Sequence, residues 1–414
     1  MATTVSLEPA ATPYWEMRGT TCREVEAELA RLWTQATTGS ARAVGPGDGV
    51  VVTEKGLTNA RTSVLNLIVT VPDESAANRV LETLLSLGTR HPSRAIVLQA
   101  DPVAEGNALD ARIGTHCREG ENGAGTVCFE QLALTVRGEA ARHLDGIVTP
   151  LMIHDLPTHV WWPGEPPFGD PVFDQLIELG DRLVLNSSDF SDLLTGLRRL
   201  GVIRRRAGVG DIAWERLAPW QELTAQFFDA PRFRRYLPNL SRLRIRYAVP
   251  DASAVSGTVP GYETVSGTAS PGAQAVLYAG WIATRLAWRR AQSKEPMAPD
   301  GVRLGLEGRY EMVDLAIDPV STNAVPPGEL LAVSLRAFGE AGSAEFIIDR
   351  PATEATIVTN ADGMTALLRR IPLEAESEAE VLRRQLVLDQ RDPLYEDALR
   401  AAAILLAAAQ EAAA

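Results

Sequence analysis

The sequence contains few cysteines and none of the short motifs that mark several large enzyme classes. Its three cysteines, Cys22, Cys117 and Cys128, are spread over 414 residues with no CxxC pair. This spacing excludes a zinc ribbon and the framework of a disulfide-rich secreted domain. No GxGxxG, GxxxxGK(S/T), HExxH or GxSxG pattern occurs, so enzymes that depend on those motifs are excluded.

Positive charge and long apolar runs are also scarce. The chain has 40 Lys and Arg against 53 Asp and Glu, a net charge of -13. This balance argues against binding nucleic acid or an anionic membrane surface through bulk positive charge. The apolar segment 273–288 is interrupted by Gln274 and Arg285 and is shorter than the roughly 20 residues of a membrane span. The first 17 residues lack the pattern of a signal peptide, and we expect a cytoplasmic protein.

The first half of the chain alternates between strand-like and helix-like segments. Residues 62–71 form an apolar run typical of a buried strand, Asp73 can cap a following helix, and AIVLQA (95–100) is a second strand. Such β-α-β units make parallel sheets. After a flexible segment at 1–19, the alternation predicts an α/β domain over 20–210, with an open, mostly parallel sheet and flanking helices. Further strands are expected at 126–136, 157–162 and 182–186, and helices at 138–149, 171–180 and 189–200.

The pattern changes after residue 210. Several strand-like runs follow one another between helices, which predicts an α+β domain with an antiparallel sheet over 211–414. Residues 251–272 are rich in Ser, Thr, Gly and Pro, and we expect a mobile surface loop there. Helices are expected at 214–228, 273–290, 376–388 and 393–411, and strands at 240–249, 301–306, 310–317, 329–338, 343–349 and 354–359.

The segment LPTHVWWPGEPP (156–167) is the sharpest local feature. Adjacent residues on a strand point to opposite faces, so one tryptophan can enter the core while the other faces a cleft or a partner. Prolines stop the strand and stiffen its exit, and glycine permits a turn. We predict a partner-binding element here; the alternative is a core tryptophan pair followed by a rigid loop. The predicted contact residues are Trp161, Trp162, Pro163, Gly164 and Glu165.

Arginine is concentrated between residues 191 and 250, where twelve Arg and no Lys stand against five acidic residues, a net charge of +7. Arginine suits bidentate contacts with carboxylates and phosphates. Arg242, Arg244 and Arg246 alternate with apolar residues, so on a strand all three point to one face. We predict a partner-docking face or an anion site; the alternative is a solvated face paired with acidic helices near the C-terminus. The twelve arginines are residues 198, 199, 204, 205, 206, 216, 232, 234, 235, 242, 244 and 246.

Four segments together resemble the glucose-6-phosphate dehydrogenase assembly protein family, OpcA. The specific part is the combination of HPSR with the downstream WWPGEPP. The likeness covers the first predicted domain well and the second only in layout, through the arginine-rich segment and the C-terminal helices. The four segments are TCREVEAELARLW (21–33), ARTSVLNLIV (60–69), HPSRAIVLQADP (91–102) and LPTHVWWPGEPPF (156–168).

The resemblance implies a role outside catalysis, so we expect no catalytic residue, no cofactor and no metal. It implies a non-enzymatic protein that binds glucose-6-phosphate dehydrogenase, promotes its active oligomer and activates it allosterically in the oxidative pentose phosphate pathway. Thiol control is linked to photosynthetic members of the family, but no cysteine follows Cys128, so a switch built on C-terminal cysteines does not carry over. The alternative hypothesis is a sugar-phosphate-binding protein or enzyme that uses the crevice near Trp161 and Trp162.

Overall fold

The chain divides into two compact units. The first consists of Met1–Leu185 with Leu382–Asp389, and the second of Asn186–Val381 with Gln390–Ala414, whereas the sequence predicted a boundary after residue 210. Most of the predicted flexible segment 1–19 and of the predicted loop 251–272 lies outside the described residues. The computed structural model describes residues 14–38, 63–87, 92–119, 126–251, 272–293, 301–340, 342–387 and 391–411.

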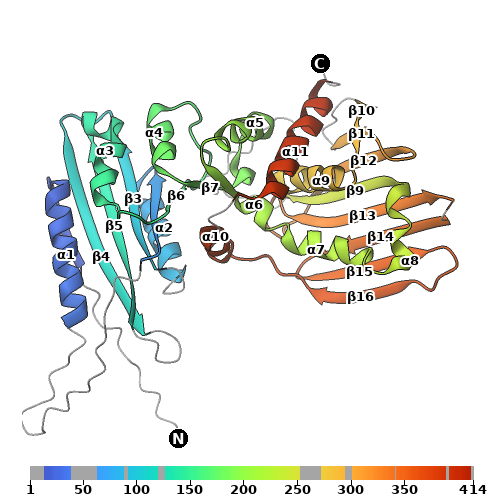
Figure 1. Cartoon of the computed structure of the whole chain (residues 1–414), viewed down its shortest axis with the longest axis horizontal. Coiled ribbons are helices and arrows are strands. Elements are labelled where there is room, and N and C mark those ends of the chain that lie inside the picture. Colours follow the sequence, from blue (N-terminus) through green and yellow to red (C-terminus); the bar gives the residue numbers. More distant parts are fainter. Residues whose placement is uncertain are drawn as a thin grey trace, which may run out of the picture. The chain divides into compact units, whose positions relative to one another are not determined.

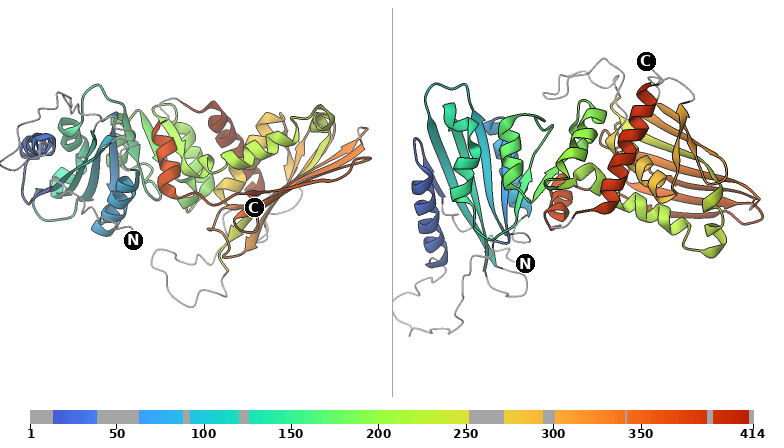
Figure 2. Two further views of the ribbon diagram at one scale, coloured as in Figure 1. Left: turned by 90° about the horizontal axis from the view of Figure 1, so that it is seen from below. Right: turned by 45° about the horizontal axis from the view of Figure 1, so that its top comes forward.

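A largely parallel sheet forms the centre of the first unit. Within this unit the strand order is β1-β4-β5-β3-β2-β6-β7. The strands from β5 to β7 are parallel to their neighbours, while β4 and β1 are antiparallel additions at one edge. Helices α3 and α4 lie on one face of the sheet and α2 lies on the other (Figures 1 and 2). This arrangement confirms the predicted α/β fold class. The elements are β1 (Tyr14–Met17), α1 (Cys22–Thr38), β2 (Leu65–Val71), α2 (Glu74–Leu87), β3 (Ser93–Asp101), β4 (Ala108–Glu119), β5 (Thr126–Arg137), η3 (Gly138–Arg142), α3 (Leu144–Val148), η4 (Thr149–Leu151), β6 (Thr158–Trp161), α4 (Pro171–Leu179) and β7 (Arg182–Leu185).

Local sequence explains where these elements begin. The side chain of Asp73 accepts a hydrogen bond from the backbone N–H of Ala76 at 2.7 Å, as the predicted cap requires. The side chain of Asp170 accepts from the N–H groups of Val172 and Phe173 at 2.8 and 3.3 Å. Both caps satisfy N–H groups that an α-helix leaves unpaired in its first turn.

Two predictions for the first unit were wrong. The single helix expected at 138–149 is broken into η3, α3 and η4. No strand was expected between residues 101 and 125, but Ala108–Glu119 forms β4, and the backbone of Cys117 pairs with that of Cys128 across β4 and β5. The segment was missed because β4 carries charged and small residues on its more exposed face, which hides the alternation of a half-buried strand.

A second mixed sheet forms the centre of the second unit. Its strand order is β10-β11-β12-β9-β13-β14-β15-β16. The described pairings are antiparallel except for β12 with β9, which is parallel. The remaining elements are η5 (Ser187–Asp189), α5 (Leu193–Ile203), β8 (Gly208–Asp211), α6 (Ile212–Glu215), α7 (Ala218–Phe227), α8 (Pro231–Arg234), η6 (Leu237–Asn239), β9 (Leu240–Val249), α9 (Ala273–Arg285), β10 (Arg289–Ser293), β11 (Val302–Glu307), β12 (Met312–Ser321), β13 (Leu330–Gly339), β14 (Gly342–Asp349), β15 (Glu354–Ala361), β16 (Leu367–Pro372), α10 (Glu378–Val387) and α11 (Pro393–Glu411).

Helices cover one face of this second sheet. Helices α7, α9 and α11 lie on the same side of it (Figures 1 and 2). The strands bury alternate residues toward these helices, including Leu243, Ile245 and Phe346. The expected helix at 273–290 ends at Arg285, and the one at 214–228 is split into α6 and α7. Strands β10 and β16 were not predicted.

Helices α9 and α11 approach each other closely at Gly280. A Cβ atom placed there would lie 2.5 Å from the carbonyl oxygen of Ala398 and 2.9 Å from the backbone nitrogen of Ala402. These are contacts with the backbone of α11, so no side chain can turn aside to make room. Glycine at this position therefore sets the distance between the two helices.

Gly280→Ala should destabilise the second unit by about 1–3 kcal/mol, the usual cost of overpacking. Gly201→Ala is the matched control, because Gly201 also lies in a helix and has nothing within 4 Å of its Cβ position. The control should gain about 0.5–1 kcal/mol from helix propensity. Urea unfolding followed by circular dichroism checks both values, and equal effects of the two substitutions would contradict the close approach.

Candidate functional site

The tryptophan pair divides between the core and the surface. Trp161, the last residue of β6, is 2% exposed. Trp162 is half-buried; its N–H donates to the carbonyl of Val184 at 2.9 Å, and its ring meets Phe173 edge-on with centroids 5.0 Å apart. The opposite orientation of the two rings was predicted. Burial of Trp161 corrects its assignment as a contact residue, because its side chain offers almost no surface to a partner.

The loop after Trp162 is held in a defined shape. Gly164 has φ 81°, a backbone conformation that other residues adopt at a cost. Backbone hydrogen bonds join Phe168 to Pro166 at 2.8 Å and Asp170 to Pro167 at 2.9 Å. Pro163 and Gly164 are half-buried and Glu165 is exposed. Trp162, Pro163, Gly164 and Glu165 form one continuous surface segment just before these hydrogen bonds, and we call it the tryptophan loop.

The tryptophan loop begins at the point in the sheet of the first unit where the order in which strands are added changes direction. The parallel strands follow one another along the chain as β2, β3, β5, β6 and β7. Across the sheet they lie in the order β5, β3, β2, β6 and β7. Strands β2 and β6 are thus neighbours whose connections leave in opposite directions. The crevice outside the carboxyl ends of such a strand pair is where ligands bind in open α/β sheets.

The residues at this position do not suit a dinucleotide. Dinucleotide-binding sheets place a glycine-rich turn and a free helix N-terminus after the first strand. Here the turn from β2 to α2 contains Pro72, Asp73 and Glu74 and no glycine. The Asp73 carboxylate already accepts the Ala76 N–H, and Glu74 adds a second negative charge in the first turn. Both carboxylates would repel a pyrophosphate.

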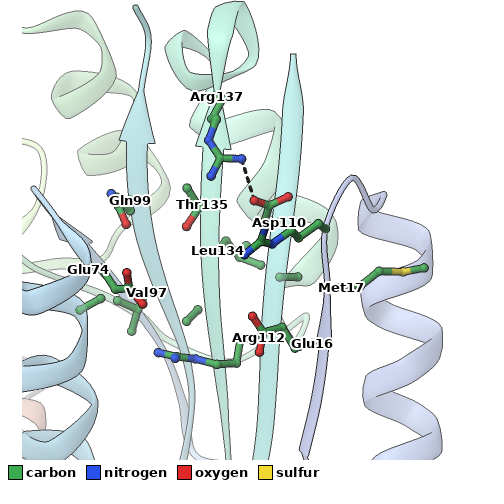
Figure 3. Close-up of a pocket in the computed structure, with 14 residues that line it drawn as sticks. Glu16, Met17, Glu74, Val97, Gln99, Asp110, Arg112, Leu134, Thr135 and Arg137 are labelled. Carbon is green, nitrogen blue, oxygen red and sulfur yellow. Dashed lines mark hydrogen bonds and ion pairs between the residues drawn. The ribbon is translucent and has the colours of Figure 1, made fainter. Parts of the chain in front are cut away.

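A polar hollow of about 310 Å³ lies elsewhere on the first unit. It lies over β3, β4 and β5 beside the start of α2 (Figure 3). None of its lining residues belongs to the tryptophan loop. In this unit β3 is joined to its parallel neighbour β5 through β4, where a helical crossover is usual. The lining includes both charge signs: Glu16, Glu74 and Asp110 with Arg18, Arg112 and Arg137.

Several of these charges are already paired within the protein. Figure 3 shows Arg137 and Asp110 pointing toward each other, at 2.6 Å between Nη1 and Oδ2. Arg112 donates to the side-chain oxygen of Asn78 at 3.1 Å. Desolvation acts to raise the pKa of Asp110, but the Gly19 N–H and Arg137 outweigh it and lower that pKa. The hollow is thus an ionic surface of mixed sign, in which Asp110, Arg112 and Arg137 already have partners within the protein.

The second predicted contact region is the arginine row of β9. Arg242, Arg244 and Arg246 face one side of the strand, while Leu243 and Ile245 are buried on the other. The shared face was predicted correctly. It is the face opposite the helices, and two hollows of about 340 and 260 Å³ open over it.

Each of these arginines has an acidic neighbour. The contacts are Arg242 with Asp314 at 3.7 Å, Arg244 with Asp318 at 2.6 Å and Arg246 with Asp349 at 2.5 Å. Asp314 and Asp318 lie on β12 and Asp349 on β14, so the alternative of a face paired with acidic C-terminal helices does not hold for this row. Arg303 also contacts Asp318 at 2.5 Å. We call this surface, which carries Arg242, Arg244 and Arg246, the open face.

Other arginines of the 191–250 segment stabilise the fold. Arg216 and the buried Arg350 bind the two carboxylate oxygens of Glu329, at 2.8 and 2.7 Å. Arg204 contacts Glu396 of α11 at 2.6 Å. Buried ion pairs of this kind are costly to break, because loss of one partner leaves an uncompensated charge. The arginines of residues 191–250 therefore do not form a single docking surface.

Sequence reasoning missed an exposed aromatic residue of the open face. Phe338 is 65% exposed and alternates along β13 with Arg336 and Ser334, so it points to the same side. The expected strand 329–338 already contained the sign of it. Its alternate residues Ser334 and Arg336 are polar, and the next residue of that set is the aromatic Phe338. A side chain of this kind is a common anchor in protein interfaces.

Comparison with known proteins identifies the family. Residues 86–201 match the model described as the glucose-6-phosphate dehydrogenase subunit N-terminal domain, and residues 207–257 and 260–399 match that of the C-terminal domain. The chain belongs to the OpcA family.

Among the described residues, no helix is both long and apolar enough to cross a membrane.

Three cyanobacterial relatives carry the name OxPP cycle protein OpcA. The Synechococcus elongatus protein is 29% identical, over 77% of this chain and 69% of its own length. The Nostoc punctiforme protein is 26% identical over 76% and 65%, and the Synechocystis protein 29% identical over 49% and 39%. The match with this OpcA chain thus covers less than two thirds of the length of the Nostoc punctiforme and Synechocystis proteins.

Solved structures of oxidoreductases are also similar to this OpcA chain. Oxidoreductase yvaA from Bacillus subtilis aligns with 84% of this chain and 97% of its own, at 10% identity and a TM-score of 0.46. Biliverdin reductase from Synechocystis aligns with 84% and 99%, at 12% identity and a TM-score of 0.43.

The different burial of the two tryptophans predicts different effects on stability. Trp161→Ala should cost about 3–5 kcal/mol, the range for removing a large core aromatic. Trp162→Ala should cost about 1–2 kcal/mol, because its ring is only partly buried. Urea unfolding followed by far-ultraviolet circular dichroism measures both. A larger loss for Trp162→Ala than for Trp161→Ala would overturn the assignment of core and surface.

Proposed function

We propose that this chain is a non-enzymatic assembly factor and allosteric activator of glucose-6-phosphate dehydrogenase in the oxidative pentose phosphate pathway. The observation that carries the proposal is the match of most of the chain to two models described as subunit domains of that dehydrogenase. The acidic turn at Asp73 and Glu74 supports it, because dinucleotide chemistry would need a different turn there. In this proposal the chain works in the cytoplasm and needs no cofactor, nucleic acid or membrane.

The open face is the first proposed contact with the dehydrogenase. Its central ion pairs are partly exposed, and such pairs contribute only about 0–1 kcal/mol each to stability. They can therefore exchange partners at little cost when a second protein arrives. Phe338 supplies an exposed aromatic side chain two residues along β13 from Arg336, whose backbone pairs with that of Arg242. A surface of mixed charge with an aromatic anchor has the composition of a specific, separable interface.

The tryptophan loop is the second proposed contact. Trp162, Pro163, Gly164 and Glu165 present a surface whose backbone is already ordered, so binding would cost little conformational entropy. Phe173 packs edge-on against the Trp162 ring, and the buried Trp161 holds the end of β6 in the core. Trp161 thus acts in this proposal as a support and not as a contact.

Activation follows from differential binding. If the chain binds the active oligomer of the dehydrogenase more tightly than its other states, mass action shifts the population toward that oligomer. The substrate and the chain then favour the same state, and each must raise the affinity of the dehydrogenase for the other by the same factor.

The proposal is tested by mixing the purified chain with the dehydrogenase from the same organism. We expect a complex by light scattering, a lower glucose 6-phosphate concentration for half-maximal rate, and tighter association when glucose 6-phosphate is present. The chain alone should give no turnover of glucose 6-phosphate with NADP⁺. Absence of both a complex and a kinetic change would refute the proposal, and turnover by the chain alone would favour an enzyme.

Charge reversal on the open face tests the docking surface. Arg244→Glu with Arg246→Glu should weaken binding at least tenfold, because the partner then meets repulsion and the neighbouring aspartates lose their counter-ions. The loss should shrink at high salt, which screens repulsion. Arg303 still neutralises Asp318 in this variant, so the sheet should remain folded.

The matched control is Arg205→Glu with Arg400→Glu, which changes the net charge equally. Arg205 and Arg400 are exposed and lie in or beside α5 and α11. Binding is measured by biolayer interferometry at three ionic strengths. If the control loses as much affinity as the open-face variant, the effect comes from net charge and the docking surface lies elsewhere.

A further inference from the structure

A hollow of about 650 Å³ opens at the C-terminal end of α9. We propose that it binds a small phosphorylated molecule that carries a ring, with arginines holding the phosphate and Trp288 packing on the ring. The hollow belongs entirely to the second unit, and it is separate from the open face and the tryptophan loop. Its principal lining residues are Leu237, Arg285, Leu286, Trp288, Arg289 and Arg309.

Positive charge dominates the lining. Three guanidinium groups, from Arg285, Arg289 and Arg309, stand against one lining carboxylate, Glu307. Arg285 contacts Asp397 at 3.2 Å. Within the part of the chain that the structure describes, neither Arg289 nor Arg309 is within 4.0 Å of a carboxylate. This contrasts with the open face, where each arginine of β9 has an acidic neighbour, and it leaves donors available for an anion.

An apolar and aromatic wall stands beside these charges. Trp288 and Leu286 follow α9 directly, and Leu237 and Pro238 of η6 also line the hollow; all four are half-buried. A volume of this size is ordinary for small-molecule sites, which combine apolar walls with a few charged groups. Inorganic phosphate would use only the charged side, whereas an organic phosphate with a ring would use both.

The backbone at the end of α9 is unusual at this point. The Trp288 N–H donates to the carbonyl of Ala283 at 2.8 Å, and the Ala287 N–H donates to that of Thr284 at 3.3 Å. This is the Schellman arrangement, whose left-handed residue is usually glycine. Here it is Ala287, with φ 54°. A strained non-glycine residue between Leu286 and Trp288 is the kind of outlier that accompanies functional sites.

The order of the chain explains why these groups meet. The Schellman turn reverses the chain after α9, so that Arg285 at the end of the helix and Arg289 at the start of β10 flank Trp288. Strand β10 pairs with β11, which places Arg289 opposite Glu307, close to the turn that carries Arg309. The three guanidinium groups therefore come from a helix end, a strand and a turn that surround one aromatic side chain.

Isothermal titration calorimetry on the full chain tests the proposal, with glucose 6-phosphate, AMP and inorganic phosphate as probes. At least one organic phosphate should bind at least tenfold more tightly than inorganic phosphate. Arg289→Gln with Arg309→Gln should weaken that binding at least tenfold. Trp288→Leu should weaken the organic phosphate and leave inorganic phosphate unchanged, because only the ring contact is lost.

The matched control is Arg205→Gln with Arg370→Gln, which removes two exposed arginines outside the hollow and should leave binding unchanged. Thermal unfolding of each variant verifies the fold. Failure of all three probes to bind, or equal losses in the variant and the control, would overturn the proposal. Because the measurement uses the chain alone, either result leaves the assembly proposal to its own test with the dehydrogenase.

Discussion

The second unit depends on the contact between helix α11 and the buried carboxylate of Asp211. The Tyr395 hydroxyl donates to Oδ2 of Asp211 at 3.1 Å, while the N–H groups of Ser187 and Ala213 both donate to Oδ1 at 3.0 Å. Burial acts against the charged form and raises the pKa of Asp211. A carboxyl group in this position is tolerated only because both of its oxygens have hydrogen-bond partners. Ala213 and Ser187 lie 2 and 24 residues from Asp211, whereas Tyr395 of α11 lies 184 residues away.

Further contacts fix the position of helix α11. Asp392, just before α11, accepts the indole N–H of Trp214 at 2.8 Å. Glu396 contacts Arg204, and the backbone near Ala398 approaches Gly280 of α9. Since α9 lies against the sheet, fixing α11 also fixes the layer of helices on one side. The opposite side of the sheet then carries the alternate, polar residues of β9, β12 and β13, and this is how the open face arises.

Short-range patterns in the sequence predicted the parts of the fold that depend on near neighbours. The alternation in β9 identified the shared side of Arg242, Arg244 and Arg246, and the adjacent tryptophans implied opposite faces. The partners of those arginines were not predictable, because Asp318 and Asp349 are brought near by the registers of β12, β13 and β14, which are distant in sequence from β9. Strand β16 was missed for another reason: Leu367 and Leu368 are both exposed, so no alternation marks a buried side.

Net charge alone gives a poor account of how this chain could recognise another protein. The whole chain is negative and the segment 191–250 is positive, which suggests a simple attraction for acidic partners. However, carboxylates of the same sheet neutralise the arginines of β9, and Arg216 is used in the fold. The open face is thus a nearly neutral pattern of alternating charges. Such a pattern discriminates by register, because a displaced partner brings like charges together, and an exposed aromatic such as Phe338 adds affinity only in the correct position.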